Sequence, residues 1–313
     1  MDFLKDIIEK HPIRKTEEQK ESFRNYVLNV VASKGVSAKV ETLGNNKNVV
    51  IGDPLTAKSV FTAHYDTPNA SLCPNLMLPK NKGLFIAYQF LIVAILLVIS
   101  LVPAIVVGVG VLKSEIAYGA IFLVLYFGLF LLNFKAFTNK NNSNDNTSGV
   151  ATVLSIIEKL DGEQLKDVAF ILFDNEEKGL LGSKAYKKAY KEQLKDKLFV
   201  NFDCVANGNN VLLIAKQNAE KSENFSLLKG AFLSKGQFSV EFCSAKNCVA
   251  NTDYKNFEQG VCVLACKKSK RGILYTPFIH TKKDVVADSQ NVEFLANGSC
   301  EFINNLNKTD EKK

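Results

Sequence analysis

The sequence predicts an α/β fold, with a mixed, mainly parallel central sheet flanked by helices and an inserted two-helix transmembrane hairpin. Strand-like and helix-like segments alternate along most of the chain, as they do in α/β sheet proteins. Two long uncharged segments interrupt this alternation between residues 84 and 134. We therefore expect one domain in two parts, residues 1–80 and 138–307, separated by a hairpin at 81–137 and followed by a tail at 308–313.

The elements outside the hairpin follow from hydrophobic periodicity and from turn and cap signals. Before the hairpin, an amphipathic helix is predicted at residues 16–34, ended by Gly35, and strands are predicted at 47–51 and 59–64. After the hairpin, the expected helices lie at 147–160, 179–190, 222–235 and 289–305, and the expected strands at 168–173, 198–203, 211–215 and 261–265.

Residues 84–112 and 116–134 are two uncharged runs of 29 and 19 residues. As helices they would be about 43 and 28 Å long, enough to cross a hydrocarbon core of about 30 Å. A pair of buried core helices is the alternative. Two adjacent runs of this length without a charge favour a hairpin that spans the lipid bilayer.

Lysines on both sides of the hairpin predict its orientation. Lys80 and Lys82 precede the first span, and Lys135 and Lys140 follow the second, whereas the short tip carries one Lys and one Glu. The positive-inside rule places both flanks in the cytoplasm. We expect a multi-pass protein of the cell membrane with two spans and its larger domain in the cytoplasm.

The cysteines indicate the compartment of the protein, and its charge indicates which partners are not expected. The seven cysteines are odd in number and irregularly spaced. Cys262 and Cys266 lie in a predicted strand, where four residues separate side chains by about 13 Å, too far for one metal ion. Free thiols in a reducing compartment are the better interpretation. The net charge of +7 comes from scattered lysines, so no nucleic-acid partner is expected, and the oligomeric state stays open.

The first candidate site residues follow the strand at 59–64, in the stretch "FTAHYDTP". His64 and Asp66 are two residues apart, so their side chains would point to the same side of the strand. A core histidine with a hydrogen-bonding partner and a metal ligand with an orienting carboxylate are both compatible with this pair alone.

A second group follows the strand at 168–173. Glu176 and Glu177 can serve one site only if the chain turns there, and Gly179 indicates such a turn. Two adjacent carboxylates would then divide the work, one binding metal and one transferring protons. A solvated acidic turn before a helix is the alternative.

Three further residues occupy similar positions: Asp145 before a helix start, Asp203 at a strand end and His280 in a loop. Each alone has an ordinary explanation, such as a helix cap or a turn. Taken together with His64 and the paired glutamates, they supply the imidazole and carboxylate ligands that two neighbouring zinc ions need. Open α/β sheets carry their sites at the carboxyl ends of strands, where these residues are expected.

In this order the motifs resemble those of the co-catalytic dizinc peptidases, which include secreted bacterial aminopeptidases, glutamate carboxypeptidase-type enzymes and glutaminyl cyclases. The resemblance covers residues of about 12–78 and 138–307, through "AHYDT", "NDNTSG", "DNEEKGLLGS", "NFD" and "IHTKKD". It implies a zinc aminopeptidase-like fold and two Zn²⁺ ions per chain. The implied zinc ligands are His64, Asp145 (bridging both ions), Glu177, Asp203 and His280. Glu176 would be the general base, and Asp66 would orient His64.

The chain departs from the family pattern at three places. Ser143-Asn144 stands where Gly or Ala is common before the bridging motif, and Ile279 stands where some members have a tyrosine beside the last histidine. The hairpin replaces a link that is usually a short loop. We expect it to anchor the enzyme without taking part in the chemistry.

The function implied is that of a membrane-anchored aminopeptidase acting on short peptides. A dizinc-bound hydroxide would attack the peptide carbonyl after Glu176 takes its proton. Within the family, a carboxypeptidase or dipeptidase, with Arg271 as a carboxylate clamp, and a glutaminyl cyclase are alternatives. A catalytically inactive membrane-anchored binding module is the alternative from another class.

Overall fold

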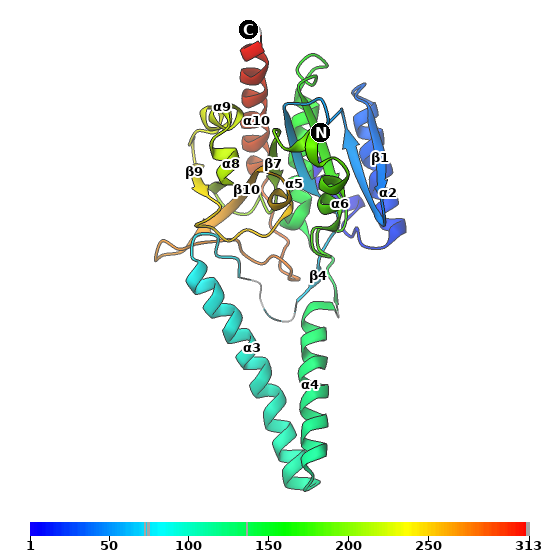
Figure 1. Ribbon diagram of the computed structural model, residues 1–313, viewed down its shortest axis with the longest axis vertical. Helices are drawn as coiled ribbons and strands as arrows, with labels where there is room; N and C mark the ends of the chain where they lie inside the picture. Colours follow the sequence, from blue (N-terminus) through cyan, green and yellow to red (C-terminus); the bar gives the residue numbers. More distant parts are fainter. Residues whose placement is uncertain (72, 74–75, 136, 311–313) are drawn as a thin grey trace.

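The computed structural model describes residues 1–71, 73, 76–135 and 137–310 (Figure 1). Its centre is a mixed sheet, and the strands of this sheet are β1 (Ala38–Leu43), β2 (Asn46–Ile51), β3 (Ser59–His64), β6 (Val168–Phe173), β7 (Leu198–Phe202), β8 (Asn210–Ala215), β9 (Ser239–Ser244), β10 (Gln259–Lys268) and β11 (Leu274–Tyr275). Among the described residues the strand order is β1-β2-β6-β3-β7-β10-β8-β9, with β11 paired to β10. The central run β6-β3-β7-β10 is parallel. The predicted mixed, mainly parallel sheet is thus confirmed.

Helices cover both faces of this sheet. They are α1 (Phe3–Lys10), α2 (Glu17–Ala32), α5 (Ser148–Lys159), α6 (Leu181–Ala189), α7 (Lys191–Leu194), α8 (Gln217–Glu220), α9 (Glu223–Ala231), the 3₁₀ helix η3 (Asp253–Asn256) and α10 (Ser289–Asp310).

The faces follow from the two-residue period of the strands. Phe61 and Phe170 point to the side that α1, α2, α5 and α10 cover, whereas Val60 and Ile171 pack on the side of α6 and α7. Both faces of the central strands are therefore buried, as in other parallel sheets.

The predicted hairpin projects from the sheet domain on the side opposite the C-terminal helix (Figure 1). It consists of α3 (Lys82–Ala104), a π-helical continuation η1 (Ile105–Val111), and α4 (Glu115–Lys135). Among the described residues these are two helices long and apolar enough to cross a membrane, Lys82–Val111 and Glu115–Asn133. Few of their side chains are buried in the protein, so they are not core helices of the domain.

The two helices meet near their tip and diverge toward the sheet domain (Figure 1). At the tip Gly108 lies so close to α4 that an added Cβ would be 2.4 Å from the Cα of Tyr118. At the other end, β4 (Asn69–Ala70) and β5 (Phe137–Thr138) form a short antiparallel ladder, in which Asn69 pairs with Thr138. We call this ladder the neck. It brings the two ends of the insertion together.

Candidate metal centre

Three parallel strands deliver candidate residues to one edge of the sheet. His64 is the last residue of β3 and is level with Phe173 at the end of β6. Thr62 is level with Asn201 on β7, which places Asp203 beside His64. The carboxyl ends of these neighbouring strands therefore form the floor of the site, as the sequence predicts.

The loop after β6 turns sharply enough for both glutamates to reach that floor. Asn175, Gly179 and Leu180 have positive φ, at 53°, 102° and 61°. The amides of Gly179 and Leu180 donate to the carbonyl oxygen of Glu176, at 2.8 and 2.7 Å. This compact turn is the one that Gly179 indicated, and it lets Glu176 and Glu177 face the same cluster.

A bent segment, η2 (Ser143–Thr147), carries Asp145 to the cluster from the start of α5. The side chain of Asn146 fixes this segment to β7, because its Nδ2 donates to the carbonyl oxygen of Phe202 at 2.9 Å. Gly149 is required by the same packing, since a Cβ there would be 2.4 Å from that oxygen. The "NDNTSG" motif is therefore built to hold Asp145 against the end of β7.

Asp284 holds the same segment from the opposite side. Its two carboxylate oxygens accept hydrogen bonds from the amides of Asn144 and Asp145, each at 3.0 Å. Asp284 lies four residues after His280 in "IHTKKD", so one loop supplies both a candidate ligand and the support for Asp145. The sequence showed this acidic residue inside the motif, but only the structure shows what it contacts.

The structure brings all five predicted ligand residues together. Asp145 Oδ1 lies 3.3 Å from His64 Nε2, and Asp145 Oδ2 lies 3.0 Å from His280 Nε2. On one side His64 Nε2 is 3.8 Å from Asp203 Oδ1, and on the other His280 Nε2 is 3.4 Å from Glu177 Oε1. Asp145 thus presents one oxygen to each of two imidazole–carboxylate pairs.

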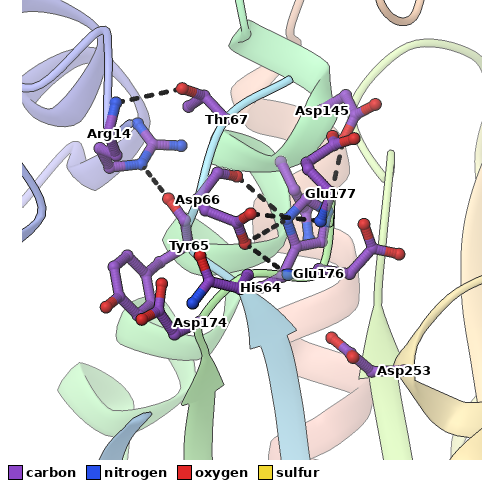
Figure 2. Close-up of polar contacts among 12 residues, drawn as sticks. Arg14, His64, Tyr65, Asp66, Thr67, Asp145, Asp174, Glu176, Glu177 and Asp253 are labelled. Atoms are coloured by element: carbon purple, nitrogen blue, oxygen red, sulfur yellow. Dashed lines mark hydrogen bonds and ion pairs between the residues drawn. The ribbon is translucent and has the colours of Figure 1, made fainter. Parts of the chain in front are cut away.

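Asp66 connects β3 to the glutamate loop (Figure 2). Its Oδ1 and Oδ2 accept hydrogen bonds from the amides of Glu176 and Glu177, at 2.9 and 3.2 Å. The contact of His64 Nδ1 with the carbonyl oxygen of Asp66 is 3.1 Å long, shorter than its 3.7 Å contact with the carboxylate. Asp66 therefore orients His64 mainly through its main chain and positions the two glutamates through its side chain.

Two basic residues that the sequence did not single out brace this arrangement. Arg14 is fully buried and donates to the carbonyl oxygen of Tyr65 and to Thr147 Oγ1 (3.0 Å), and Figure 2 shows it beside Tyr65 and Thr67. Burial lowers the pKa of Arg14 to about 10, so it stays charged near neutral pH. Lys20 Nζ contacts Asp174 Oδ1 at 2.6 Å, just ahead of the glutamate loop. Arg14 lies just before the helix predicted at residues 16–34 and Lys20 lies within it, and nothing in that pattern marks either residue as part of a site.

The cluster carries an excess of negative charge. Burial favours a neutral His64, but the carboxylates of Glu176 and Asp145 outweigh it and raise the pKa of His64 well above its ordinary value. Burial raises the pKa of Glu176 far above its ordinary value, and the nearby carboxylates of Glu177 and Asp253 add to this against the effect of His64. Such a site favours the binding of cations.

The donor set fits metal ions. Four ligands at about 2.1 Å from a tetrahedral zinc are about 3.4 Å apart, close to the separations between the histidines and carboxylates of the cluster. Ligand atoms of His64, Asp145 and Glu177 all lie within 4.8 Å of one another, as do those of His64, Glu176 and Asp203. Glu177 Oε1 is buried and makes no hydrogen bond. Imidazole nitrogens and carboxylate oxygens together are a zinc-type donor set.

A cavity of about 1020 Å³ lies over the cluster. Its lining includes His64, Asp145, Glu176, Glu177, Asp203 and His280. Its walls also include apolar side chains, and among them are residues of the hairpin. This volume is just above the range of about 300–1,000 Å³ that is typical of small-molecule sites.

Comparisons with known proteins agree with this architecture. The chain superposes on the LapA aminopeptidase of Legionella pneumophila with a TM-score of 0.57 at 14% identity, covering 97% of this chain and 70% of that one. It superposes on the glutaminyl cyclase of Porphyromonas gingivalis with a TM-score of 0.57 at 12% identity, covering 97% and 96%. A Zn-dependent exopeptidase from Parabacteroides distasonis gives a TM-score of 0.56 at 13% identity, covering 96% and 95%. At these identities the likeness establishes the fold.

A search of curated proteins finds no match to the sequence. A family model does match. It covers residues 137–300, just over half of the chain, and includes Asp145, Glu176, Glu177, Asp203 and His280. The chain therefore belongs to peptidase family M28.

Proposed function

We propose that the protein is a membrane-anchored, zinc-dependent aminopeptidase that binds two Zn²⁺ ions per chain and removes N-terminal residues from peptides. The observation that carries the proposal is the placement of Asp145, with one carboxylate oxygen toward His64 and the other toward His280. A carboxylate in this position would bridge two ions. His64 and Asp203 would complete one site, and Glu177 and His280 the other.

Glu176 is the residue best placed to act as the general base. It lines the cavity, it is buried, and its main-chain amide is held by Asp66. Bound zinc would acidify a coordinated water and polarise the scissile carbonyl. Glu176 takes the proton of the attacking water and returns it to the leaving amine, so that peptide and water become a free amino acid and a shortened peptide.

The charge distribution favours an N-terminal over a C-terminal substrate end. Four Lys and Arg residues are among the described residues that line the cavity: Arg14, Lys15, Lys20 and Lys178. Arg14 and Lys20, the two that lie beside the loops of the cluster, already hydrogen-bond to protein oxygens. Arg271, the clamp considered for a carboxypeptidase, is exposed and is not among the described residues that line the cavity. The carboxylate excess around Glu176 instead suits a protonated α-amine.

The membrane anchor is the second part of the proposal. The spans Lys82–Val111 and Glu115–Asn133 leave apolar side chains exposed along their length, for example Phe90, Val98 and Val124, at 69%, 58% and 72%. A bilayer would remove this surface from water. The lysines beside the spans and the seven cysteines, all of them described and free, support a cytoplasmic sheet domain.

The test is a matched pair of substitutions at adjacent residues. Glu176→Gln should retain zinc and lower kcat by about 10² or more. Glu177→Gln should lower the zinc content, because it weakens a ligand. Both are compared with the wild-type protein on peptides with a free or an acetylated N-terminus. Equal cleavage of the free and the acetylated peptide would exclude an aminopeptidase. Cyclisation of an N-terminal glutamine without hydrolysis would indicate the glutaminyl cyclase alternative.

A further inference from the structure

One face of α3 changes its surroundings along its length. Leu96, Ser100 and Ala104 recur every four residues and are buried. They belong to the half of α3 nearer the tip, where the helices come together (Figure 1). Continued toward the sheet domain, the same stripe passes through Ile92 and Phe85, which are both half-buried. At this level α3 and α4 have diverged, so the stripe no longer meets the other helix.

That upper part of the stripe faces the active-site cavity. Phe85, Gln89 and Ile92 line the cavity that contains the candidate zinc ligands. Asn133, near the end of α4, lines it as well, and its Oδ1 accepts a hydrogen bond of 2.9 Å from the amide of Cys73. The cavity therefore extends from the metal centre into the space between the two helices, where Met77 adds a further apolar surface.

The dimensions indicate what this extension can hold. Phe85 and Ile92 are seven residues apart, about 10 Å along a helix. An extended peptide covers that distance with about three residues. Ile92 lies about 15 Å along α3 from Lys82, so the extension reaches well into the apolar part of the first span.

We propose that the hairpin forms part of the substrate site and selects peptides with apolar residues after the N-terminal one, which enter from the bilayer between α3 and α4. This inference rests on the proposed aminopeptidase function and names its substrate class. The free amine lies at the carboxylate-rich metal centre, and the following apolar side chains pack on Phe85 and Ile92. The hairpin is then more than the anchor that the sequence predicts.

The test compares hydrolysis of two hexapeptides by the full-length protein in detergent micelles. Both begin with leucine, and five apolar residues follow in one and five serine or glycine residues in the other. We expect Phe85→Ala and Ile92→Ala each to lower the apolar-to-polar ratio of kcat/KM about tenfold, as expected for removing a partly buried apolar contact. The matched controls are Phe90→Ala and Ile95→Ala, whose side chains are exposed on α3, at 69% and 44%. They should keep the wild-type ratio.

A second type of variant fills the extension instead of emptying it, so the test does not depend on alanine variants that could fail to fold. Ile92→Trp should lower the same ratio by blocking the extension, whereas Ile95→Trp should not, and zinc content reports whether each variant is folded. Equal ratios in the Phe85 and Phe90 variants would overturn the inference.

A binding measurement separates this inference from the proposed function. The chain has no tryptophan, so an apolar peptide carrying one tryptophan is the only indole emitter in a mixture with the wild-type, Phe85→Ala or Phe90→Ala protein. Weaker binding to Phe85→Ala than to Phe90→Ala would support the inference even if no peptide were hydrolysed, an outcome that would refute only the aminopeptidase proposal. Equal binding alongside normal hydrolysis would refute only the role of the hairpin.

Discussion

Replacing Asp66 by asparagine separates two roles that this residue combines. The main-chain carbonyl that contacts His64 Nδ1 is unchanged in Asp66→Asn. The carboxylate, however, accepts the amides of both Glu176 and Glu177. An asparagine side chain offers only one oxygen to these two donors, so its NH₂ group would face one of the amides. The substitution therefore disturbs the glutamate loop more directly than it disturbs the histidine.

The expected fall in kcat follows from the hydrogen bond that is lost between the side chain of Asp66 and one amide of the glutamate loop. A hydrogen bond to a charged group contributes about 1.5–3 kcal/mol, and here its loss also leaves a buried amide without an acceptor. If this free energy is lost from the correct placement of Glu176, kcat should fall about 10- to 100-fold, because each 1.4 kcal/mol corresponds to a factor of about ten. Loss of a residue that supports metal ligands has a similar effect in metalloenzymes generally.

The assay measures kcat for leucine 4-nitroanilide at saturating zinc and, separately, the zinc dissociation constant by competition with a chelator. We expect a lower kcat that added zinc does not restore. A normal kcat at saturating zinc with weaker zinc binding would mean that Asp66 acts through His64 alone. Unchanged kcat and unchanged zinc affinity would refute any positioning role of its side chain.

Three further predictions concern the metal, pH and stability. His64→Ala and His280→Ala should each reduce the zinc content measured by metal analysis, and two retained ions in both variants would contradict the ligand assignment. Burial lowers the pKa of His11 below 6.5, so the folded state binds a proton there less readily than the unfolded state does. The protein should therefore lose stability as the pH falls below about 6.5. The melting temperature of His11→Phe should fall less between pH 7 and 5 than that of the wild type. Lys20→Met should lower the free energy of unfolding by about 3–5 kcal/mol, because it leaves Asp174 buried without its cation, and denaturant unfolding that matches the wild type would contradict this.

The sequence predicts the centre of the sheet better than its edges. β6 is a continuous apolar run, β3 is buried at every position, and the predicted bounds of both strands match the structure to within a residue. The edge strands β1 and β9 were missed, because both are partly exposed and lack such a run. Edge strands need fewer apolar residues, so their sequences resemble loops.

Motif order predicted which residues gather at the metal centre, but it could not show what supports them. Asp284 and Asn146 hold Asp145 through contacts across long stretches of sequence. Nothing in the residue pattern indicates that Asp66 binds amides of the glutamate loop, or that Phe85 reaches the same cavity as His64. Such relations depend on the packed chain, which brings distant residues within a few ångströms.

The strand order has a consequence for how the protein is made. β3 is synthesised before the hairpin, but its neighbours in the sheet, β6 and β7, are both synthesised after it. The ribosome must therefore release both apolar helices before the centre of the sheet can form. In the proposed topology the chain is already in the membrane when β3 acquires its partners, and in the folded protein the neck joins the two ends of the insertion. The candidate metal centre draws residues from both sides of the insertion, so it can be completed only after both apolar helices have been synthesised.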